Sequence, residues 1–338
     1  MEEKLTLEMV QDAWKYLKKE YVTHRTPMVT STMTDDRVDR HVYFKMENQQ
    51  KTGSFKLRGA SYKVHSLTTE ELKRGVVSSS AGNHAQGVAM AAYRLGERAT
   101  IFMPKTTPEA KINAATGYGA KVILVGDSYE EAGDAAQKYH EENNVTYVHP
   151  YDDFYVMAGQ GTIALEMLEQ EPDLDMIICP IGGGGLISGV ALTAKKMKPS
   201  IKIIGVEAAQ AASMHHAFKT GEIKRLETAN TIAEGIAVKE PGKNTYAVVK
   251  QYVDDIVTVT EEEIADAVLW MLERNKTLVE GAGAASLAAL LAHNDSLPKA
   301  DKIGLIVSGG NIDLSAMPMI QSVARGLNKA VEVKSRQY

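Results

Sequence analysis

Short apolar runs rich in β-branched residues alternate with amphipathic stretches along almost the whole chain. The runs are HVYFKM, GVVSSS, RATIFMP, KVILVG, VTYVHP, MIICPIG, IKIIGVE, DIVTVT and KIGLIVSG. The stretches between them have helical spacing over residues 85–95, 107–115, 128–142, 185–198, 261–276 and 283–292. Because strands that alternate with helices pair into parallel sheets covered by helices on both faces, the pattern predicts an α/β fold.

One change of pattern marks a boundary within this alternation. In HPYDDFYVMAGQGT, residues 149–162, Pro150, Asp152 and Asp153 end one block before a new helix begins. Proline and aspartate favour turns and helix starts, so we expect a domain boundary near Asp152.

Composition excludes several classes of partner. The chain of 338 residues has a formal net charge of -5, which provides no basic surface for nucleic acid or for an anionic membrane. Its apolar runs are too short to span a bilayer, and its single cysteine, Cys179, cannot form an intrachain disulfide. The N-terminal stretch has a helical stripe of Leu7, Val10, Trp14 and Leu17 and does not resemble a signal peptide. We therefore expect a cytoplasmic protein.

A lysine lies in an unusual setting in QKTGSFKLRGA, residues 50–60. Lys56 stands between Phe55 and an Arg-Gly-containing helix pattern, directly after a flexible polar stretch. A solvated helix start, capped by Ser54 and burying Leu57, explains most of this stretch. The alternative is a lysine held beside an aromatic ring, which suits the binding of a flat cofactor through its carbonyl group.

Four consecutive glycines follow a buried strand in MIICPIGGGGLISGVA. Gly182 to Gly185 let the backbone approach an anion closely, and a helix that starts there presents free N–H groups to a phosphate. The loop is not the dinucleotide fingerprint, because Ile187 or Ser188 stands where that motif has its third glycine. It also lacks the lysine of a Walker loop. The alternative to a phosphate site is a tight turn that needs glycine for packing.

Two further loops place small polar residues at strand ends. In SSSAGNHAQG, residues 78–87, hydroxyl and N–H groups at a helix start can hold a carboxylate, and Asn83 can bond a ring oxygen. His84 has no carboxylate or nucleophile beside it in the motif, which favours a structural role. In LIVSGGNIDL, residues 305–314, Ser308 can approach a ring nitrogen, although an ordinary turn fits as well. A lysine, a phosphate loop and this serine together predict pyridoxal 5′-phosphate.

These motifs carry a resemblance to a known family. The segments SFKLRGA, SSAGNHAQG, PYDD, GQGT, GGGGL, GVE, TIAEGIAV, EGAGA and SGGN follow one another in the family's order. From Thr26 to Ile312 the chain resembles the fold-type II pyridoxal-phosphate enzymes, specifically the threonine dehydratase and serine racemase family. The resemblance implies a tryptophan synthase β-like α/β fold of two domains, each with a mainly parallel open sheet flanked by helices. The predicted large, cofactor-binding domain comprises residues 1–74 and 153–338, and the small domain comprises residues 75–152.

The resemblance also assigns roles position by position. It implies that Lys56 is the catalytic residue and binds the cofactor as a Schiff base, with Phe55 packed against the ring. The other implied cofactor contacts are Asn83 at the ring hydroxyl, Ser308 at the ring nitrogen, and Gly182, Gly183, Gly184, Gly185 and Leu186 at the phosphate. The implied contacts of the substrate carboxylate are Ser79, Ser80, Ala81, Gly82, Asn83 and His84.

Two departures from the family pattern narrow the expected activity. The racemases have a serine before the Gly-Asn-His, and it donates a proton on the ring face opposite the lysine; this chain has Ala81 there. The racemases' divalent-cation site pairs the acid of GVE with a carboxylate a few residues on, whereas Glu207 is followed by AAQAAS, so we expect no metal. The chain also stops soon after SGGNIDL, so it resembles the short catabolic dehydratases without a C-terminal regulatory domain.

The favoured function is therefore a pyridoxal-phosphate-dependent dehydratase, or ammonia-lyase. It would convert L-threonine to 2-oxobutyrate and ammonia, and L-serine to pyruvate. A serine racemase or hydroxyaspartate dehydratase is the alternative within the family, and a cofactor-binding protein without turnover is the alternative outside enzymes. The failed glycine spacing disfavours a nicotinamide oxidoreductase.

Two properties follow less directly. Family members generally associate, and the N-terminal helix carries an apolar stripe, so we expect a homodimer or a homotetramer. The sequence leaves open whether a nucleotide such as AMP activates the protein.

Overall fold

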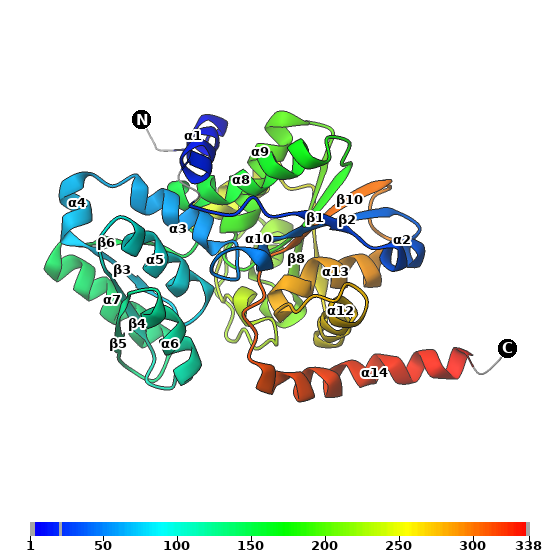
Figure 1. Ribbon diagram of the computed structural model, residues 1–338. Helices are drawn as coiled ribbons and strands as arrows, with labels where there is room; N and C mark the ends of the chain where they lie inside the picture. The colour runs from blue at the N-terminus through cyan, green and yellow to red at the C-terminus, as the bar shows by residue number, and fades with distance from the viewer. Residues whose placement is uncertain (1–3, 20–21, 336–338) are drawn as a thin grey trace.

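The larger of two sheets forms the centre of the molecule. The structure is a computed structural model that describes residues 4–19 and 22–335, with side-chain burial described as far as residue 326. The six strands of this sheet lie in the order β1 (Met28–Thr30), β2 (His41–Met46), β10 (Lys302–Val307), β7 (Met176–Pro180), β8 (Lys202–Ala208) and β9 (Asp255–Val259). All neighbours are parallel except β1 and β2, which run antiparallel (Figure 1). Strands β7 and β10 are completely or almost completely buried because helices cover both faces of the sheet.

A second sheet is built from a single continuous part of the chain. Its four strands, all parallel, lie in the order β5 (Lys121–Leu124), β4 (Ala99–Met103), β3 (Val76–Ser79) and β6 (Thr146–Tyr147). We call residues 75–152, which contain these strands, the inserted segment. The division into domains at residues 75 and 152 stays a prediction, since Ala60 and Val64 from before the segment pack in the core of its sheet.

The helices fall into two groups around these sheets. Those of the inserted segment and its approach are α4 (Thr69–Arg74), α5 (Asn83–Arg94), α6 (Glu109–Gly117) and α7 (Tyr129–Asn143). The others are α1 (Leu7–Lys19), α2 (Thr32–Val38), α3 (Lys56–His65), α8 (Phe154–Gln170), α9 (Gly185–Met197), α10 (Ser213–Thr220), α11 (Lys243–Tyr252), α12 (Glu261–Glu273), α13 (Gly281–His293) and α14 (Met317–Ser335). Single 3-10 turns lie at Glu47–Gln49 (η1), Ala209–Ala211 (η2), Glu234–Ile236 (η3) and Leu314–Ala316 (η4).

The α/β fold with mainly parallel sheets is thus as the sequence predicts, and each of the nine apolar runs contains a strand. Strand β1 was missed because three residues are too few to show a period of two. Cys179 is fully buried in β7, as expected for a strand residue.

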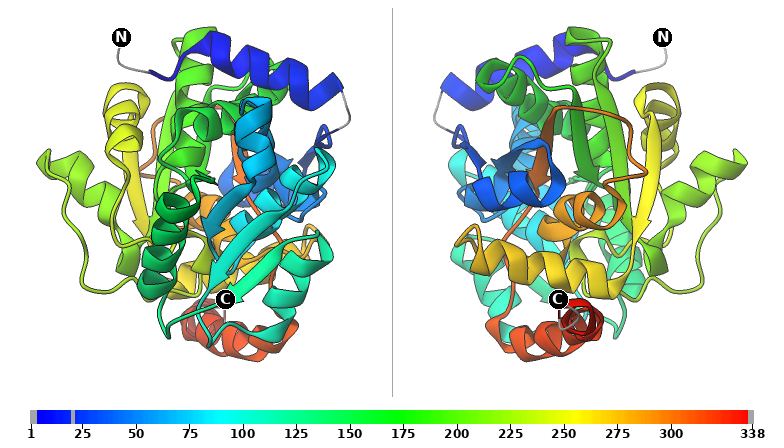
Figure 2. Two further views of the ribbon diagram at one scale, coloured as in Figure 1. Left: turned by 90° about the vertical axis from the view of Figure 1, so that its left-hand side faces the viewer. Right: turned by 90° about the vertical axis from the view of Figure 1, so that its right-hand side faces the viewer.

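The apolar stripe of α1 is covered within the chain. Val10 and Leu17 are buried, and Val10 packs in one cluster with Ala158 and Leu165 of α8. Figure 2 shows α1 lying across the end of the molecule opposite α14. The use of this stripe as an argument for association was therefore wrong, because α8 already satisfies it. Within the described residues, none of the helices combines the length and the apolar character that crossing a bilayer requires.

Candidate active site

Lys56 is the first residue of α3 and follows a loop that is bonded to the end of β10. The N–H of Phe55 donates to the carbonyl of Ser308 at 3.1 Å, and the N–H of Gly310 donates to the carbonyl of Gly53 at 2.9 Å. Ser54 does not cap the helix: its hydroxyl is buried and has no partner within the described residues. The expected Ser54 cap and solvated helix start were therefore wrong, because the loop is packed against a strand end, whereas Leu57 is fully buried as expected.

The amine of Lys56 is held between a carbonyl and an aromatic ring. Its Nζ donates to the carbonyl of Pro150 at 2.7 Å and lies 5.3 Å from the centroid of the Phe55 ring. Burial lowers the pKa of Lys56 to about 8, against the opposing effect of the negative charge of Glu280. A useful fraction of this amine is therefore neutral, and so nucleophilic, near neutral pH.

A buried ionic cluster anchors the helix that carries this lysine. Arg58 is fully buried and donates from Nε to Glu47 at 2.8 Å and from one terminal nitrogen to Glu166, also at 2.8 Å. Lys45 completes the cluster by donating to the second oxygen of Glu166 at 2.7 Å. Burial acts to lower the pKa of Arg58, but the two carboxylates outweigh it and raise that pKa, whereas for Lys45 burial prevails and lowers the pKa. Breaking such a cluster leaves a buried charge unpaired, so the first turn of α3 has little freedom to move.

Asn83, the first residue of α5, joins the inserted segment to the larger sheet. Its Nδ2 donates to Glu280 at 2.8 Å, and its Oδ1 accepts from Nδ2 of Asn311 at 2.7 Å. Burial raises the pKa of Glu280 to about 7, while the bond from Asn83 lowers it. Glu280 and Asn311 were not predicted as site residues, although their motifs EGAGA and SGGN were noticed. The sequence signal that could have identified Glu280 is its position directly before a glycine-rich helix start.

The four-glycine loop connects β7 to the first turn of α9, as predicted. Gly184 has a φ of +97°, a conformation that side-chain-bearing residues rarely adopt. A Cβ on Gly183 would overlap the ring of Tyr151, and one on Gly185 would lie 2.8 Å from the Cα of Tyr151. Packing against Tyr151 is therefore one reason for glycine here. The first N–H groups of α9 have no carbonyl partner within their own helix, which leaves them available to an anion.

The loop of small polar residues connects β3 to α5. The hydroxyl of Ser80 accepts from the N–H of Gly82 at 3.2 Å, and Ser79 is the last residue of β3. A Cβ placed on Gly82 would meet no atom within 4 Å among the described residues. Ala81 is only 3% exposed and packs in the core of the four-stranded sheet. The open space at this loop therefore lies at Gly82 and not at Ala81.

His84 is held as a neutral donor. Its Nε2 lies 3.0 Å from the carbonyl of Val148, so Nε2 carries the proton, and its buried Nδ1 has no partner within the described residues. Burial and the nearby charge of Lys56 lower the pKa of His84 to about 3. The histidine therefore presents a lone pair at Nδ1 and no positive charge.

These loops follow the carboxyl ends of β3 in the smaller sheet and of β7 and β10 in the larger one. A Cβ on Gly309 would lie 2.5 Å from Oε1 of Glu280 and 3.1 Å from Nδ2 of Asn83, which places the end of β10 against both residues. The glycine loop borders the same region through Tyr151, which follows Pro150, the partner of Lys56. An amine, an amide, a strand-end hydroxyl and a helix N-terminus match the aldehyde, ring hydroxyl, ring nitrogen and phosphate of pyridoxal phosphate, so the residues present fit this cofactor.

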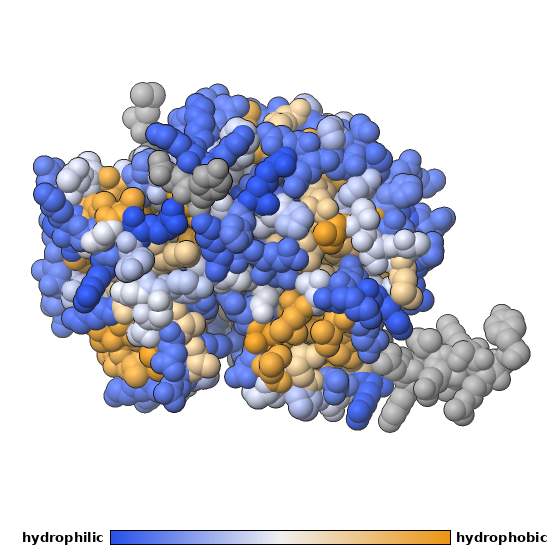
Figure 3. Space-filling view, viewed as in Figure 1, coloured by the Kyte–Doolittle hydropathy of each residue, from blue (hydrophilic) through white to orange (hydrophobic). Residues whose placement is uncertain are grey.

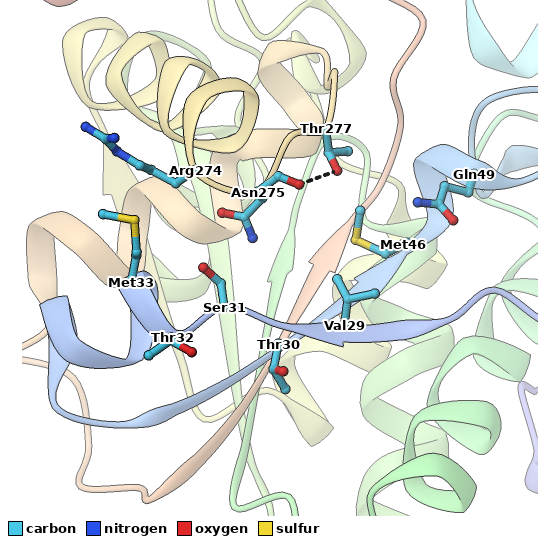
Figure 4. A pocket seen from close by; sticks show the side chains of 10 residues that line it. All are labelled: Val29, Thr30, Ser31, Thr32, Met33, Met46, Gln49, Arg274, Asn275 and Thr277. Carbon is cyan, nitrogen blue, oxygen red and sulfur yellow. Dashed lines mark hydrogen bonds between the residues drawn. The ribbon is translucent and has the colours of Figure 1, made fainter.

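Other features of the structure lie apart from this region. A pocket of about 380 Å³ between β1, α2 and the loop after α12 is lined by Val29, Met33, Arg274 and others, and contains none of the predicted site residues (Figure 4). Among the described residues, no group of three or more histidine, cysteine, aspartate or glutamate side chains could hold a metal ion. The carboxylate of Glu207 accepts the N–H groups of Met214 and His215 at 2.9 and 2.6 Å, at the start of α10.

Comparisons with known proteins show which proteins this chain is similar to. The chain is 47% identical over 96% of its length to an L-threonine ammonia-lyase of Thermotoga maritima, of which it covers 80%. It is 45% identical over 90% of its length to a catabolic L-threonine dehydratase of Staphylococcus aureus, of which it covers 89%. Among solved structures, the processed form of threonine deaminase isoform 2 from Solanum lycopersicum has a TM-score of 0.91 at 36% identity, over 96% of this chain and 91% of that one.

A maize serine racemase is also similar, with a TM-score of 0.89 at 38% identity, over 97% of this chain and 99% of that one. A family model described as "Pyridoxal-phosphate dependent enzyme" matches residues 20–309. That range contains every residue to which the sequence assigns a role in the site. The chain belongs to the pyridoxal-phosphate-dependent enzyme family.

Proposed function

We propose that this protein is a threonine ammonia-lyase that converts L-threonine to 2-oxobutyrate and ammonia, and L-serine to pyruvate and ammonia. The observation that carries the chemistry is the amine of Lys56, whose lowered pKa and placement between Phe55 and Pro150 suit both covalent binding and proton transfer. The choice of substrate is supported by relatives named for threonine that are 45 to 47% identical over at least nine-tenths of the chain.

Lys56 has two tasks in this proposal. The chemistry supplied by bound pyridoxal phosphate is withdrawal of electrons from the substrate Cα, which makes the Cα proton acidic and permits loss of the β-hydroxyl. When the amine of the substrate takes the place of the Lys56 amine at the cofactor, the Lys56 amine is free. It would then accept the Cα proton as a general base. The buried cluster around Arg58 keeps the first turn of α3 in place while this happens.

The remaining predicted residues bind and orient. The first N–H groups of α9, at Gly185 and Leu186, would hold the phosphate. The loop from Ser79 to His84 would hold the substrate carboxylate through hydroxyl and N–H groups, with Gly82 leaving space for it. Ser308 would donate a hydrogen bond to the ring nitrogen without transferring a proton to it, which favours elimination over a long-lived carbanion.

Serine racemase is the second candidate, favoured by the similarity to the maize enzyme. Against it, Ala81 has no group that can donate a proton, and its side chain is buried in an apolar core. The test incubates the holoenzyme with L-serine and measures pyruvate and D-serine together, with L-threonine and 2-oxobutyrate in parallel. Formation of D-serine faster than pyruvate would overturn the assignment, and no turnover of either substrate would leave a cofactor-binding protein.

We also propose that the protein works in the cytoplasm as a homodimer or homotetramer. Figure 3 shows an apolar patch over α12 and the start of α14. The exposed side chains of Leu272, Leu314 and Met319 belong to α12, to the turn η4 that directly precedes α14, and to α14. Such a patch supports association. Light scattering at micromolar concentration tests it, and a monomer alone would contradict it.

A further inference from the structure

The amide of Asn83 is held at both ends by residues from outside the inserted segment. Its Nδ2 donates to Oε1 of Glu280 at 2.8 Å, and its Oδ1 accepts from Nδ2 of Asn311 at 2.7 Å. Asn83 begins α5, Glu280 precedes α13, and Asn311 follows β10. A change in Glu280 or Asn311, which lie outside the inserted segment, therefore alters the hydrogen bonds of Asn83 within it.

The partners determine which way round this amide faces. Nδ2 of Asn311 also donates to the backbone carbonyl of Thr52 at 2.7 Å. Because a backbone carbonyl only accepts, the atom of Asn311 that faces Thr52 is the nitrogen, and the same nitrogen faces Asn83. Asn83 must therefore present its oxygen to Asn311 and its nitrogen to Glu280.

Space for this arrangement is provided by three glycines. A Cβ on Gly53 would lie 2.3 Å from Oδ1 of Asn311, and one on Gly309 would lie 2.5 Å from Oε1 of Glu280. A Cβ on Gly235 would lie 3.2 Å from the same oxygen of Glu280. Any side chain at Gly53 or Gly309 would therefore displace Asn311 or Glu280.

We propose that Asn311 and Glu280 are positioning residues that keep the N–H side of the Asn83 amide turned toward the ring hydroxyl of the cofactor. This inference rests on the proposed function. The Nδ2 group carries two N–H bonds, and within the described part of the chain Glu280 accepts only one of them. In this proposal the other N–H is the donor for the ring oxygen. A reversed amide would turn Oδ1 of Asn83 toward the ring oxygen, and two acceptors would then face each other without a hydrogen bond.

A reciprocal exchange of donor and acceptor tests the orientation itself. Asn311→Asp removes the donor to Asn83, so the amide turns over and brings its oxygen against the carboxylate of Glu280. The double variant Asn311→Asp with Glu280→Gln restores both bonds around a reversed amide, because the introduced aspartate accepts from Nδ2 of Asn83 and the introduced glutamine donates to its Oδ1. Asn48→Asp is the matched control, since Asn48 also donates to a backbone carbonyl, that of Leu278, and lies near Gly310.

The readouts are the dissociation constant of pyridoxal phosphate, from absorbance titration of each apoprotein, and the melting temperature of each apoprotein. We expect the affinity to fall about tenfold or more in Asn311→Asp and to stay low in the double variant, as for loss of one hydrogen bond to a charged group. The double variant should nevertheless melt closer to the parent than Asn311→Asp does. Asn48→Asp should bind the cofactor as the parent does.

Three results would overturn the inference. These are unchanged affinity in Asn311→Asp, an equal loss in Asn48→Asp, or recovery of affinity in the double variant, which would show that only the number of bonds matters. A parent protein that binds no pyridoxal phosphate at all would instead overturn the proposed function, and this inference with it.

Discussion

The two loops that open helices beside Lys56 differ in how much of their shape the protein itself determines. In the four-glycine loop, added Cβ atoms would meet Tyr151 at Gly183 and Gly185, and Met214 at Gly184. In the loop before α5, an added Cβ at Gly82 would meet nothing within 4 Å in the described structure. The first loop is thus shaped by packing before any ligand binds, whereas the second leaves open space beside Gly82.

This difference matches the two proposed ligands. A cofactor that stays bound is served by a loop whose geometry is fixed by the fold, because no ordering is then required on binding. A substrate that enters and leaves in each cycle is served by an open loop. Substitutions in the first loop should therefore change stability and cofactor affinity together, and a substitution at Gly82 in the second should change substrate affinity alone.

The largest expected effect comes from Lys56, which lies between the two loops. Lys56→Ala should lower kcat by about 10³-fold or more, because it removes both the nucleophile for the cofactor and the general base. It should also remove the visible absorbance of lysine-linked cofactor. Lys56→Arg keeps the positive charge but cannot form the link, so it should be equally inactive. Near-normal turnover in either variant would contradict the cofactor assignment.

The second effect is the pH dependence of cofactor capture by the apoprotein. The neutral amine of Lys56 is the nucleophile, and its pKa is about 8. The rate of capture should rise about tenfold per pH unit below pH 8 and level off above it, as the neutral fraction does. Stopped-flow absorbance from pH 6 to 10 measures this. A rate that keeps rising to pH 10 would indicate a lysine with an ordinary pKa.

Gly184→Ala tests the claim that packing shapes the glycine loop. The residue has a φ of +97°, and its Cβ would lie 2.6 Å from the terminal methyl of Met214. We expect the free energy of unfolding of the apoprotein to fall by roughly 1–3 kcal/mol, with a weaker affinity for pyridoxal phosphate. Chemical denaturation and cofactor titration measure the two quantities. A fall in stability with unchanged affinity would mean that the loop is only a packing turn.

Sequence reasoning predicted the four-glycine loop and the loop before α5 well because each of them continues directly from a strand into a helix. Gly182 and Ser308 follow recognisable strand patterns, so their presence at one edge of a sheet could be inferred. The residues that bond to Lys56 and Asn83 could not be inferred from the sequence. Pro150 and Glu280 approach Lys56 and Asn83 only through the pairing of strands far apart in the sequence, and no local period reports such contacts.

The burial of Arg58 could not be predicted from the local sequence either. A lone arginine in an amphipathic helix is usually exposed, but here it is fully buried by Glu47 and Glu166, the second of which lies 108 residues away. The apolar stripe of α1 was likewise read correctly as a buried face and assigned to the wrong partner, because α8 covers it. Patterns along the chain thus give the face of an element but not what lies against it.

Gly82→Ala tests the open loop and should have a smaller effect. Because the added methyl meets no atom in the described structure, the stability should stay within about 0.5 kcal/mol of the parent. If the space belongs to the substrate, KM for L-threonine should rise about tenfold, the equivalent of one lost contact of about 1.4 kcal/mol. Steady-state kinetics and thermal unfolding measure both. An unchanged KM would remove the contrast between the two loops.

The smallest effect on the reaction is expected from Ala81→Ser, which restores the hydroxyl present in the racemases that the chain resembles. Ala81 packs with Ala85 and Ile101 in the core of the four-stranded sheet and is 3% exposed. A hydroxyl there has mainly apolar neighbours, and a buried hydroxyl without a partner costs about 1–3 kcal/mol. The variant should therefore form D-serine from L-serine at less than about a tenth of the rate of pyruvate, a difference in barrier of more than about 1.4 kcal/mol. Measuring both products in the parent and the variant decides the matter. If Ala81→Ser racemises L-serine as fast as it eliminates water, the side chain at residue 81 must reach the substrate, and the open part of the loop is then wider than Gly82 alone.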